Sequence, residues 1–146
     1  MTTYDTTFDI DAAVAQVWEV LTDFPRYPEW NSAVSSLAGD LSVGSVLAIR
    51  LEMGSSAMDV KATVTEVESE SRFAWRGKLG AEFLFTGIRA FTLESQGEGT
   101  TRVRHLETVQ GLIVPPFVML KRKALAEHHN GFNRSLKERA EELAQL

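Results

Sequence analysis

Residues 33 to 110 form a succession of strand-like segments separated by turns, and no helical pattern interrupts them. Parallel strands need a crossover of a dozen or more residues, usually a helix, between one strand and the next. Because these segments follow one another through short turns, they predict an antiparallel sheet. The turn signals are Gly39-Asp40, Gly44, Gly54-Ser55-Ser56, Glu70-Ser71 and Gly97-Glu98-Gly99.

Helices are expected only outside this run of strands. Residues 3–10 alternate as a half-buried strand, and residues 11–24 carry apolar side chains at helical spacing with Asp11 as a candidate N-cap. The segment PRYPEWN holds two prolines and allows only a short helical turn. A long helix from about Pro116 to Leu146 has one apolar side, made of Phe117, Leu120, Ala124, Leu125, His128, Phe132, Leu136 and Leu143.

This order of elements, a strand, two short helices, about six strands and a long helix, predicts an α+β fold with the helices on one face of an antiparallel sheet. A curved sheet that covers a single amphipathic helix leaves a space between the two. We expect the function of the chain to lie in that space.

Composition and charge exclude several functions. The 146 residues suit one domain, 1–146, and the net charge of −5 argues against nucleic acid or an anionic membrane as the main partner. No cysteine is present, so disulfides and thiolate metal ligands are absent. The apolar stretch GLIVPPFVML, 111–120, is too short to span a bilayer, and the first ten residues lack a signal-peptide pattern. We expect a cytoplasmic protein without stable membrane insertion; a homodimer is left open.

The alternation within each strand predicts which side chains face the space under the sheet. Four rows are assigned to this inner face. They are Leu47, Ile49, Leu51 and Met53; Phe73, Trp75 and Leu79; Phe83, Phe85, Gly87, Arg89, Phe91 and Leu93; and Val103, His105, Glu107 and Val109. The last two rows therefore place charged and polar side chains on an otherwise apolar face.

A hairpin register brings these polar residues together. If the loop QGEGT, 96–100, joins the last two strands, Arg89 lies opposite Glu107 and Phe91 lies opposite His105. A buried charge is costly alone and tolerable beside a partner of opposite sign, so the predicted pairing satisfies both Arg89 and Glu107.

The residues described so far resemble the SRPBCC superfamily over essentially the whole chain. Within it, the chain most resembles the bacterial polyketide cyclase/dehydrase and lipid-transport-like group, relatives of START domains and of the birch-pollen allergen family. The segments that carry this resemblance are VWEVLTDFPRYPEWN (17–31), FTGIRAFTLE (85–94), TTRVRHLETVQGLIVPPF (100–117) and GFNRSLKERAEEL (131–143).

The resemblance implies a helix-grip fold, in which a seven-stranded antiparallel sheet wraps the C-terminal helix around a deep hydrophobic cavity. Members of the superfamily bind or carry lipids, steroids, hormones or quinones, or cyclise and dehydrate polyketides. This chain departs from the common pattern at two positions. Ser32 stands where a proline often follows the WN pair, and Arg89 stands where many relatives have a histidine.

The candidate ligand-binding residues combine the inward rows with the apolar side of the long helix. They are Trp30, Trp75, Phe85, Arg89, Phe91, His105, Glu107, Phe117, Leu120, Ala124 and His128. Trp30 has an alternative role as a core anchor, with Asn31 capping a turn. His128 has an alternative role in a hydrogen bond within the protein.

Other features of the C-terminal segment allow simple interpretations. His129 is expected to be solvated at the edge of the apolar side, and Gly131 indicates either a kink or close packing against a strand. GLIVPPF, 111–117, suits a mobile lid, or a connection that starts the helix with Pro116 in its first turn. The basic run KRK, 121–123, is expected to be a solvated helix face.

Two functions fit these residues. In the first, a binding module holds a small hydrophobic molecule, with Arg89, Glu107, His105 and His128 around its polar end. In the second, a cyclase or dehydratase uses His105 or Glu107 as the base and Arg89 to stabilise the enolate oxygen. A Glu107 paired with Arg89 would be a poor base, which shifts that role to His105. Binding is the preferred interpretation.

Metal and cofactor chemistry receive little support from the sequence. His105 and Glu107, with His128 nearby, would supply three metal ligands, but a neighbouring Arg89 is unfavourable for a cation. The nucleophile elbow and the Gly-rich oxyanion loop of a serine hydrolase are absent. We therefore expect no metal site and no cofactor.

Overall fold

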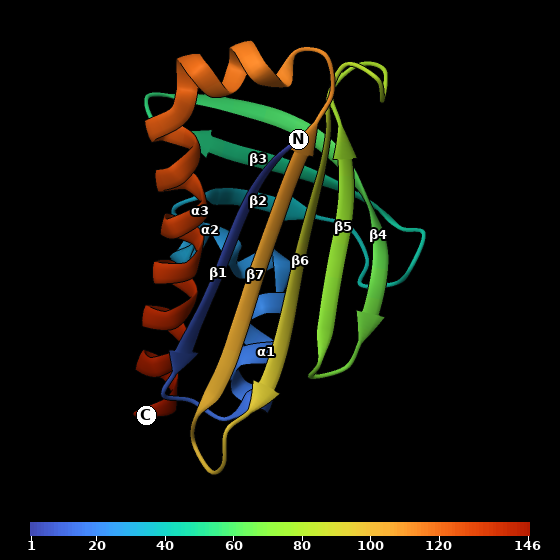
Figure 1. Ribbon diagram of the computed structural model, residues 1–146. Helices are drawn as coiled ribbons and strands as arrows, with labels where there is room; N and C mark the ends of the chain where they lie inside the picture. The colour runs from blue at the N-terminus through green and yellow to red at the C-terminus, as the bar shows by residue number, and fades with distance from the viewer.

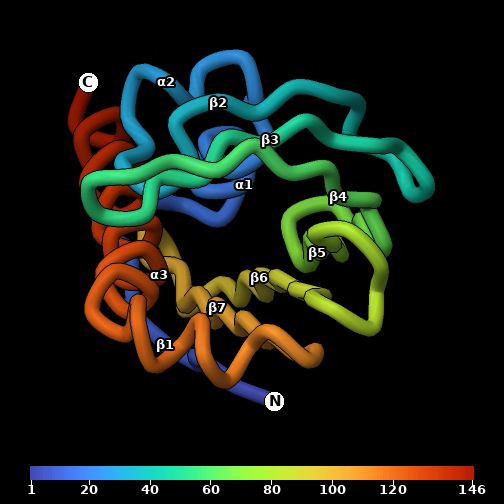
Figure 2. The backbone as a smooth tube through the Cα atoms, turned by 90° about the horizontal axis from the view of Figure 1, so that it is seen from above, coloured from blue at the N-terminus to red at the C-terminus, as the bar shows by residue number.

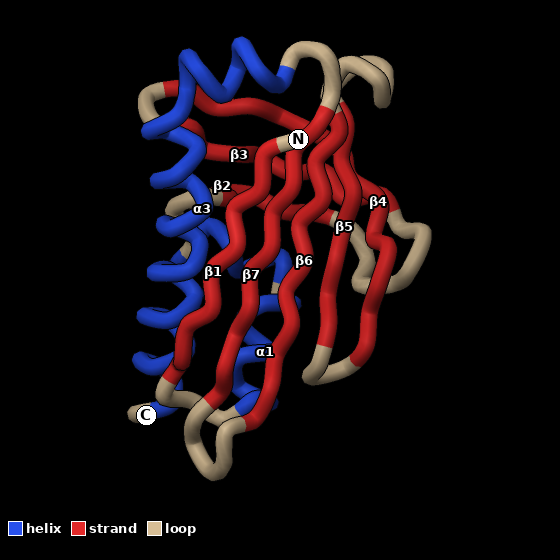
Figure 3. The backbone as a smooth tube through the Cα atoms, in the orientation of Figure 1, coloured by secondary structure: helices blue, strands red, loops and turns tan.

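The computed structural model describes residues 1–146 and contains one antiparallel sheet and three α-helices (Figures 1 and 3). The sheet has seven strands in the order β1-β7-β6-β5-β4-β3-β2. The strands are β1 (Thr2–Ile10), β2 (Val34–Ala38), β3 (Val46–Met53), β4 (Ser56–Glu68), β5 (Arg72–Lys78), β6 (Thr86–Ser95) and β7 (Thr101–Gln110). The helices are α1 (Val14–Thr22), α2 (Tyr27–Trp30) and α3 (Val114–Ala144), with a 3-10 turn, η1 (Phe24–Arg26), before α2. The predicted α+β helix-grip fold is confirmed.

The sheet curves into an arc that is closed by α3. Viewed from above, β2 and β3 lie across from β6 and β7, β4 and β5 form the bend, and α3 lies along the open side (Figure 2). Register shifts between Val34 and Ser36 on β2 and between Val64 and Glu66 on β4 mark irregularities in the ladder. Such bulges bend a strand and increase its twist, which helps the sheet to curl.

The concave side of the sheet is filled differently at its two ends. At the end where α3 terminates, α1 and α2 lie beneath the sheet (Figure 1), and their apolar side chains join a core that includes Tyr27, Phe73, Phe91, Phe132 and Leu136. At the end where α3 begins, no other helix lies under the sheet (Figure 1). The concave side of the sheet is therefore covered by α1, α2 and α3 at the first end and by α3 alone at the second.

Two predictions are wrong where a helix or strand begins: the N-cap of α1 and the first residue of the inward row on β6. Helix α1 begins at Val14 without a side-chain cap, and the backbone N–H of Asp11 instead donates to Glu141 Oε2 at 2.8 Å. Asp11 is therefore held by the far end of α3 rather than by its own helix. Phe83 was expected in an inward row, but β6 begins only at Thr86, and Phe83 lies in the preceding turn with 66% of its surface exposed.

The long helix is less regular than its sequence pattern indicates. It begins at Val114, two residues earlier than expected, with Pro115 and Pro116 in the first turn, where their missing N–H groups cost little. Lys121 has non-helical angles, φ −118° and ψ 22°, and divides α3 into two segments. The kink lies ten residues before Gly131, which instead approaches Ser32 closely: a Cβ at Gly131 would lie 3.2 Å from Ser32 Oγ.

No helix of the chain is both long enough and apolar enough to cross a lipid bilayer.

Candidate functional site

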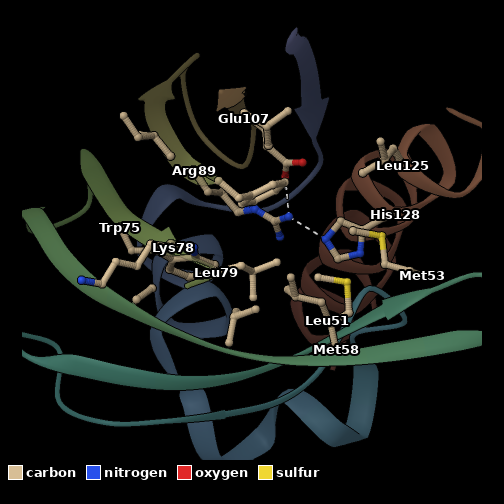
Figure 4. Close-up of a pocket in the computed structure, with 17 residues that line it drawn as sticks. Leu51, Met53, Met58, Trp75, Lys78, Leu79, Arg89, Glu107, Leu125 and His128 are labelled. Carbon is tan, nitrogen blue, oxygen red and sulfur yellow. Dashed lines mark hydrogen bonds and ion pairs between the residues drawn. The ribbon is translucent and has the colours of Figure 1, made fainter. Parts of the chain in front are cut away.

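A cavity opens between the sheet and α3 at the end where that helix begins (Figure 4). Its wall is largely apolar and comes from β3 to β7, from the turn between β5 and β6, and from α3. Its volume is about 70 Å³. The lining residues are Leu51, Met53, Met58, Val60, Ala62, Trp75, Gly77, Lys78, Leu79, Phe85, Gly87, Ile88, Arg89, Glu107, Val109, Leu125 and His128.

Three polar side chains meet in this apolar wall. Arg89 on β6 and Glu107 on β7 are direct cross-strand partners, as the hairpin register predicted, and their side chains form a buried salt bridge. Arg89 Nη2 also lies 2.6 Å from Nε2 of His128 on α3. Figure 4 shows the guanidinium between the carboxylate and the imidazole, at the centre of the cavity wall.

The hydrogen bonds of His128 fix its tautomer. A guanidinium has only donors, so Nε2 of His128 must accept the bond from Arg89. Nδ1 lies 2.9 Å from the backbone carbonyl oxygen of Glu52, which can only accept, so Nδ1 carries the proton. His128 is therefore a neutral imidazole that bridges α3 and β3.

Burial and neighbouring charges agree with this assignment. Burial, together with the positive charge of Arg89, lowers the pKa of His128 to about 4. Burial alone would raise the pKa of Glu107, but the Arg89 guanidinium and the nearby histidines hold the pKa of that carboxyl below its ordinary value. At neutral pH, the cluster contains one positive charge, one negative charge and a neutral ring.

One hydrogen-bond donor of this cluster is unused. Nη1 of Arg89 is buried and has no hydrogen-bond partner. The guanidinium carbon lies 5.6 Å from the centre of the Trp75 ring and 5.1 Å from that of Phe132, so aromatic faces flank the charge. An unpaired donor in a buried site is costly, and Arg89 is itself part of the cavity wall. Nη1 is therefore the group in the site best suited to a bond with a ligand oxygen.

His105 occupies a different place from the one expected. It is fully buried between two rings, with Phe91 stacked on one side at 4.3 Å and His129 on the other at 4.0 Å. Nδ1 of His105 lies 2.7 Å from Oδ1 of Asn133 and donates to it. Burial and the Arg89 charge hold the pKa of His105 well below its ordinary value. His105 is absent from the cavity wall, so the stack separates it from the cavity.

The expectation that His129 is solvated is wrong. Only 2% of its surface is exposed, because β1 covers this side of α3 and Nε2 of His129 lies 3.0 Å from Thr6 Oγ1. Tyr4, also on β1, packs its ring 5.7 Å from the imidazole. The sequence pattern of α3 alone carried no information about the strand that packs against it.

His105, Glu107 and His129 form the one histidine–carboxylate cluster with potential metal-ligand atoms close together, within 4.8 Å of one another. The two imidazole planes are nearly parallel, 12° apart, so their in-plane lone pairs do not converge on a common point. The carboxylate of Glu107 is also occupied by Arg89. The arrangement suits a packed polar core better than a cation site, and His128, the third ligand considered from sequence, is engaged by Arg89 and Glu52.

The cavity wall contains five of the residues expected to bind a ligand: Trp75, Phe85, Arg89, Glu107 and His128. The other six lie elsewhere. Trp30 packs on Tyr27 and Phe132 in the core, with ring centres 4.9 and 6.2 Å away, while Asn31 Oδ1 caps the turn by accepting the N–H groups of Ala33 and Val34.

The remaining expected residues are distributed behind and outside the wall. Phe91 and His105 belong to the stacked rings. Phe117 packs edge-on against Phe85 at 5.9 Å, and Ala124 lies beside the turn at Gly54. Leu120 is 82% exposed, because the kink at Lys121 turns the first segment of α3 away from the helical side predicted from the sequence.

One row of the cavity wall was not identified from sequence. Met58, Val60 and Ala62 of β4 line the cavity. Their alternation with Asp59, Lys61 and Thr63 is the signal that would have found them.

Comparison with known proteins adds a family assignment. The chain matches the model of the family described as polyketide cyclase / dehydrase and lipid transport over residues 1–141. It belongs to this family. No curated protein matches the chain.

Solved structures with the same fold include a START superfamily protein from Mycobacterium smegmatis, 20% identical, with a TM-score of 0.75 over 97% of this chain and 98% of that one. The Zhui aromatase/cyclase from Streptomyces sp. R1128 is 13% identical, with a TM-score of 0.77 over 96% and 93% of the two chains. Ara h 8.0201 is 12% identical, with a TM-score of 0.73 over 95% and 97%. At identities of 12–20%, the similarity to these structures establishes a shared fold and nothing beyond it.

Proposed function

We propose that this family member binds a small hydrophobic molecule in the cavity between the sheet and α3, and that a neutral oxygen acceptor of the ligand accepts a hydrogen bond from Nη1 of Arg89. The observation that carries this proposal is the buried, unpartnered donor of Arg89 in a largely apolar wall. Pockets for small molecules combine such a wall with a few fixed polar groups.

The charge balance of the site favours a neutral ligand. Glu107 already neutralises Arg89, and His128 is neutral at physiological pH. Lys78, the other charged residue of the wall, is exposed to solvent and lies outside this buried cluster. A carboxylate or phosphate would bring an uncompensated negative charge close to Glu107, at a high cost in a poorly solvated place. A ketone, ester, amide or quinone oxygen accepts a hydrogen bond without that cost.

The size of the cavity requires its wall to adapt. Pockets for drug-sized ligands measure about 300–1,000 Å³, whereas this cavity holds about 70 Å³. Met53 and Met58 lie in its wall, and methionine side chains rearrange more easily than branched ones. We infer that a ligand larger than a few heavy atoms displaces these side chains as it enters.

Displacement of a neutral apolar dye such as Nile red tests this function. We expect saturable dye binding, and an aromatic ketone that displaces the dye about tenfold more effectively than the hydrocarbon of the same shape. The variant Arg89→Met/Glu107→Met removes the donor without leaving an unpaired charge and should abolish that preference. Equal displacement by ketone and hydrocarbon would refute the role of Arg89, and the absence of saturable binding would refute the proposal as a whole.

The cyclase or dehydratase alternative has weaker support in the site. Arg89 Nη1 is suited to an enolate oxygen, but His105 is enclosed by rings and Glu107 is held by Arg89. Neither is free to remove a proton from a molecule in the cavity. Turnover of poly-β-keto or β-hydroxy thioesters by the wild type, lost in His105→Gln at unchanged dye affinity, would reverse this preference.

A further inference from the structure

Exposed apolar side chains gather where α3 begins. We define the apolar tip as Phe83, Leu112, Ile113, Met119 and Leu120, with exposed fractions of 41–84%. The backbone N–H of Leu112 donates to the carbonyl oxygen of Phe83 at 3.0 Å, so the turn before β6 and the start of α3 lie side by side (Figure 1, top). Exposed groups of this kind on a soluble chain often mark an interaction surface.

Unpaired positive charge adjoins the apolar tip. Lys121, Arg122 and Lys123 are exposed and form no salt bridge, and Arg122 is the one arginine of the chain without a carboxylate partner. The net charge of the chain is −5, so this run is a local exception. Opposite charges elsewhere are screened beyond a Debye length of about 8 Å at physiological salt. The run can therefore attract an anionic surface despite the overall charge.

The same surface borders the cavity. Met53 lines the cavity and also a surface groove whose other edge is formed by Met119 to Ala124 and Glu127. The Glu127 carboxylate is paired with Arg134, so it does not neutralise the basic run. On the inner side of the first segment of α3, Phe117 packs on Phe85 of the cavity wall. The first segment of α3 therefore has one side packed on the cavity wall and another side toward solvent.

We propose that the apolar tip and Lys121–Lys123 dock this end of the molecule reversibly on an anionic lipid bilayer. Exposed apolar side chains next to a run of basic ones suit the acyl boundary and the headgroups of such a surface. A second copy bound through a two-fold axis would bring two basic runs together, which is unfavourable. Exchange of a ligand between bilayer and cavity would follow from docking, and that part rests on the proposed function.

Co-sedimentation of the ligand-free protein with vesicles tests the docking. We expect binding to phosphatidylcholine vesicles that contain roughly one-third phosphatidylserine, weakening as salt is raised, and little binding to pure phosphatidylcholine. The variant Lys121→Gln/Arg122→Gln/Lys123→Gln should bind about a hundredfold more weakly, because each charge removed weakens binding by about fivefold. Met119→Gln/Leu120→Gln should also lose binding, whereas Lys61→Gln and Val43→Gln, exposed changes outside this surface, should retain it.

Several results would overturn the proposal. These are the absence of sedimentation with anionic vesicles, equal binding of wild type and both surface variants, or a dimer in solution that Met119→Gln/Leu120→Gln converts to monomer without any effect on vesicle binding. Dye binding, measured on the same proteins without vesicles, reports the cavity separately. Vesicle binding without dye binding would support docking while refuting the proposed function. Dye binding without vesicle binding would support the proposed function while refuting docking.

Discussion

Arg89 on β6 and Glu107 on β7 lie directly opposite each other, and their side chains form a salt bridge. Only 6% of the Arg89 side chain and 8% of the Glu107 side chain is exposed. The structure thus encloses two opposite charges in the wall of an apolar cavity, where each depends on the other for its stability.

The first prediction concerns this dependence. Arg89→Met leaves the Glu107 carboxylate buried without its partner, and we expect the free energy of unfolding to fall by about 3–5 kcal/mol. In Arg89→Met/Glu107→Met no charge remains in the wall, and most of that loss should be recovered. Urea unfolding of the wild type, both single variants and the double variant measures the coupling. If the double variant lost as much free energy of unfolding as the two single variants added together, the interpretation would be contradicted.

The second prediction is a loss of stability in acid. His128 has a pKa of about 4 in the native protein against an ordinary value of 6.5. Below pH 6.5 the unfolded chain gains a proton that the native protein does not bind. The full contribution is therefore present above that pH and is lost as pH falls toward 4. Its size is about 3 kcal/mol, and the lowered pKa values of His105 and His129 act in the same direction.

Denaturant unfolding between pH of about 7 and 4.5 measures this effect. His128→Gln keeps an acceptor for Arg89 and a donor for Glu52 but does not titrate, so its stability should depend less steeply on pH. Asn130→Gln, an exposed change two positions along the same helix, should follow the wild type. An identical slope in His128→Gln and wild type would show that His128 is not responsible.

The pairing of Arg89 with Glu107 could be predicted from sequence because it depends only on the register of two strands that are neighbours in the chain. The five-residue loop 96–100 joins β6 and β7 directly, so a count along two neighbouring strands places Arg89 against Glu107. The same count places Phe91 against His105. Contacts between elements far apart in the chain were not accessible in this way.

His129 and Leu120 illustrate that limit. A helical pattern predicts which side of α3 is apolar, but it does not say that β1 covers His129 through Thr6 or that the helix kinks at Lys121. The kink exposes Leu120, which a continuous helix would have placed beside Ala124. The position of a residue relative to a distant strand depends on tertiary packing, which overrides the local pattern.

The third prediction separates the cavity wall from the core behind it. Trp75 lines the cavity, whereas Phe91, expected in the same role, is stacked on His105. Trp75→Leu should weaken dye binding several-fold. Phe91→Leu should lower the free energy of unfolding by about 1–2 kcal/mol and leave dye affinity unchanged. Dye titration and urea unfolding on both variants test this. A loss of dye affinity in Phe91→Leu but not in Trp75→Leu would show that the dye binds beside Phe91 instead.

The last prediction concerns the approach of α3 to the segment after α2. A Cβ at Gly131 would lie 3.2 Å from Ser32 Oγ, and that hydroxyl lies 3.0 Å from Ser135 Oγ. Alanine is favoured over glycine in a helix by about 1 kcal/mol, but in the wild type the tight contact with Ser32 should offset most of this gain. In the Ser32→Ala background the hydroxyl is gone, and Gly131→Ala should then stabilise the protein by about 1 kcal/mol. Urea unfolding of the four proteins gives the coupling energy, and an equal effect of Gly131→Ala in both backgrounds would show that the close approach does not limit this position.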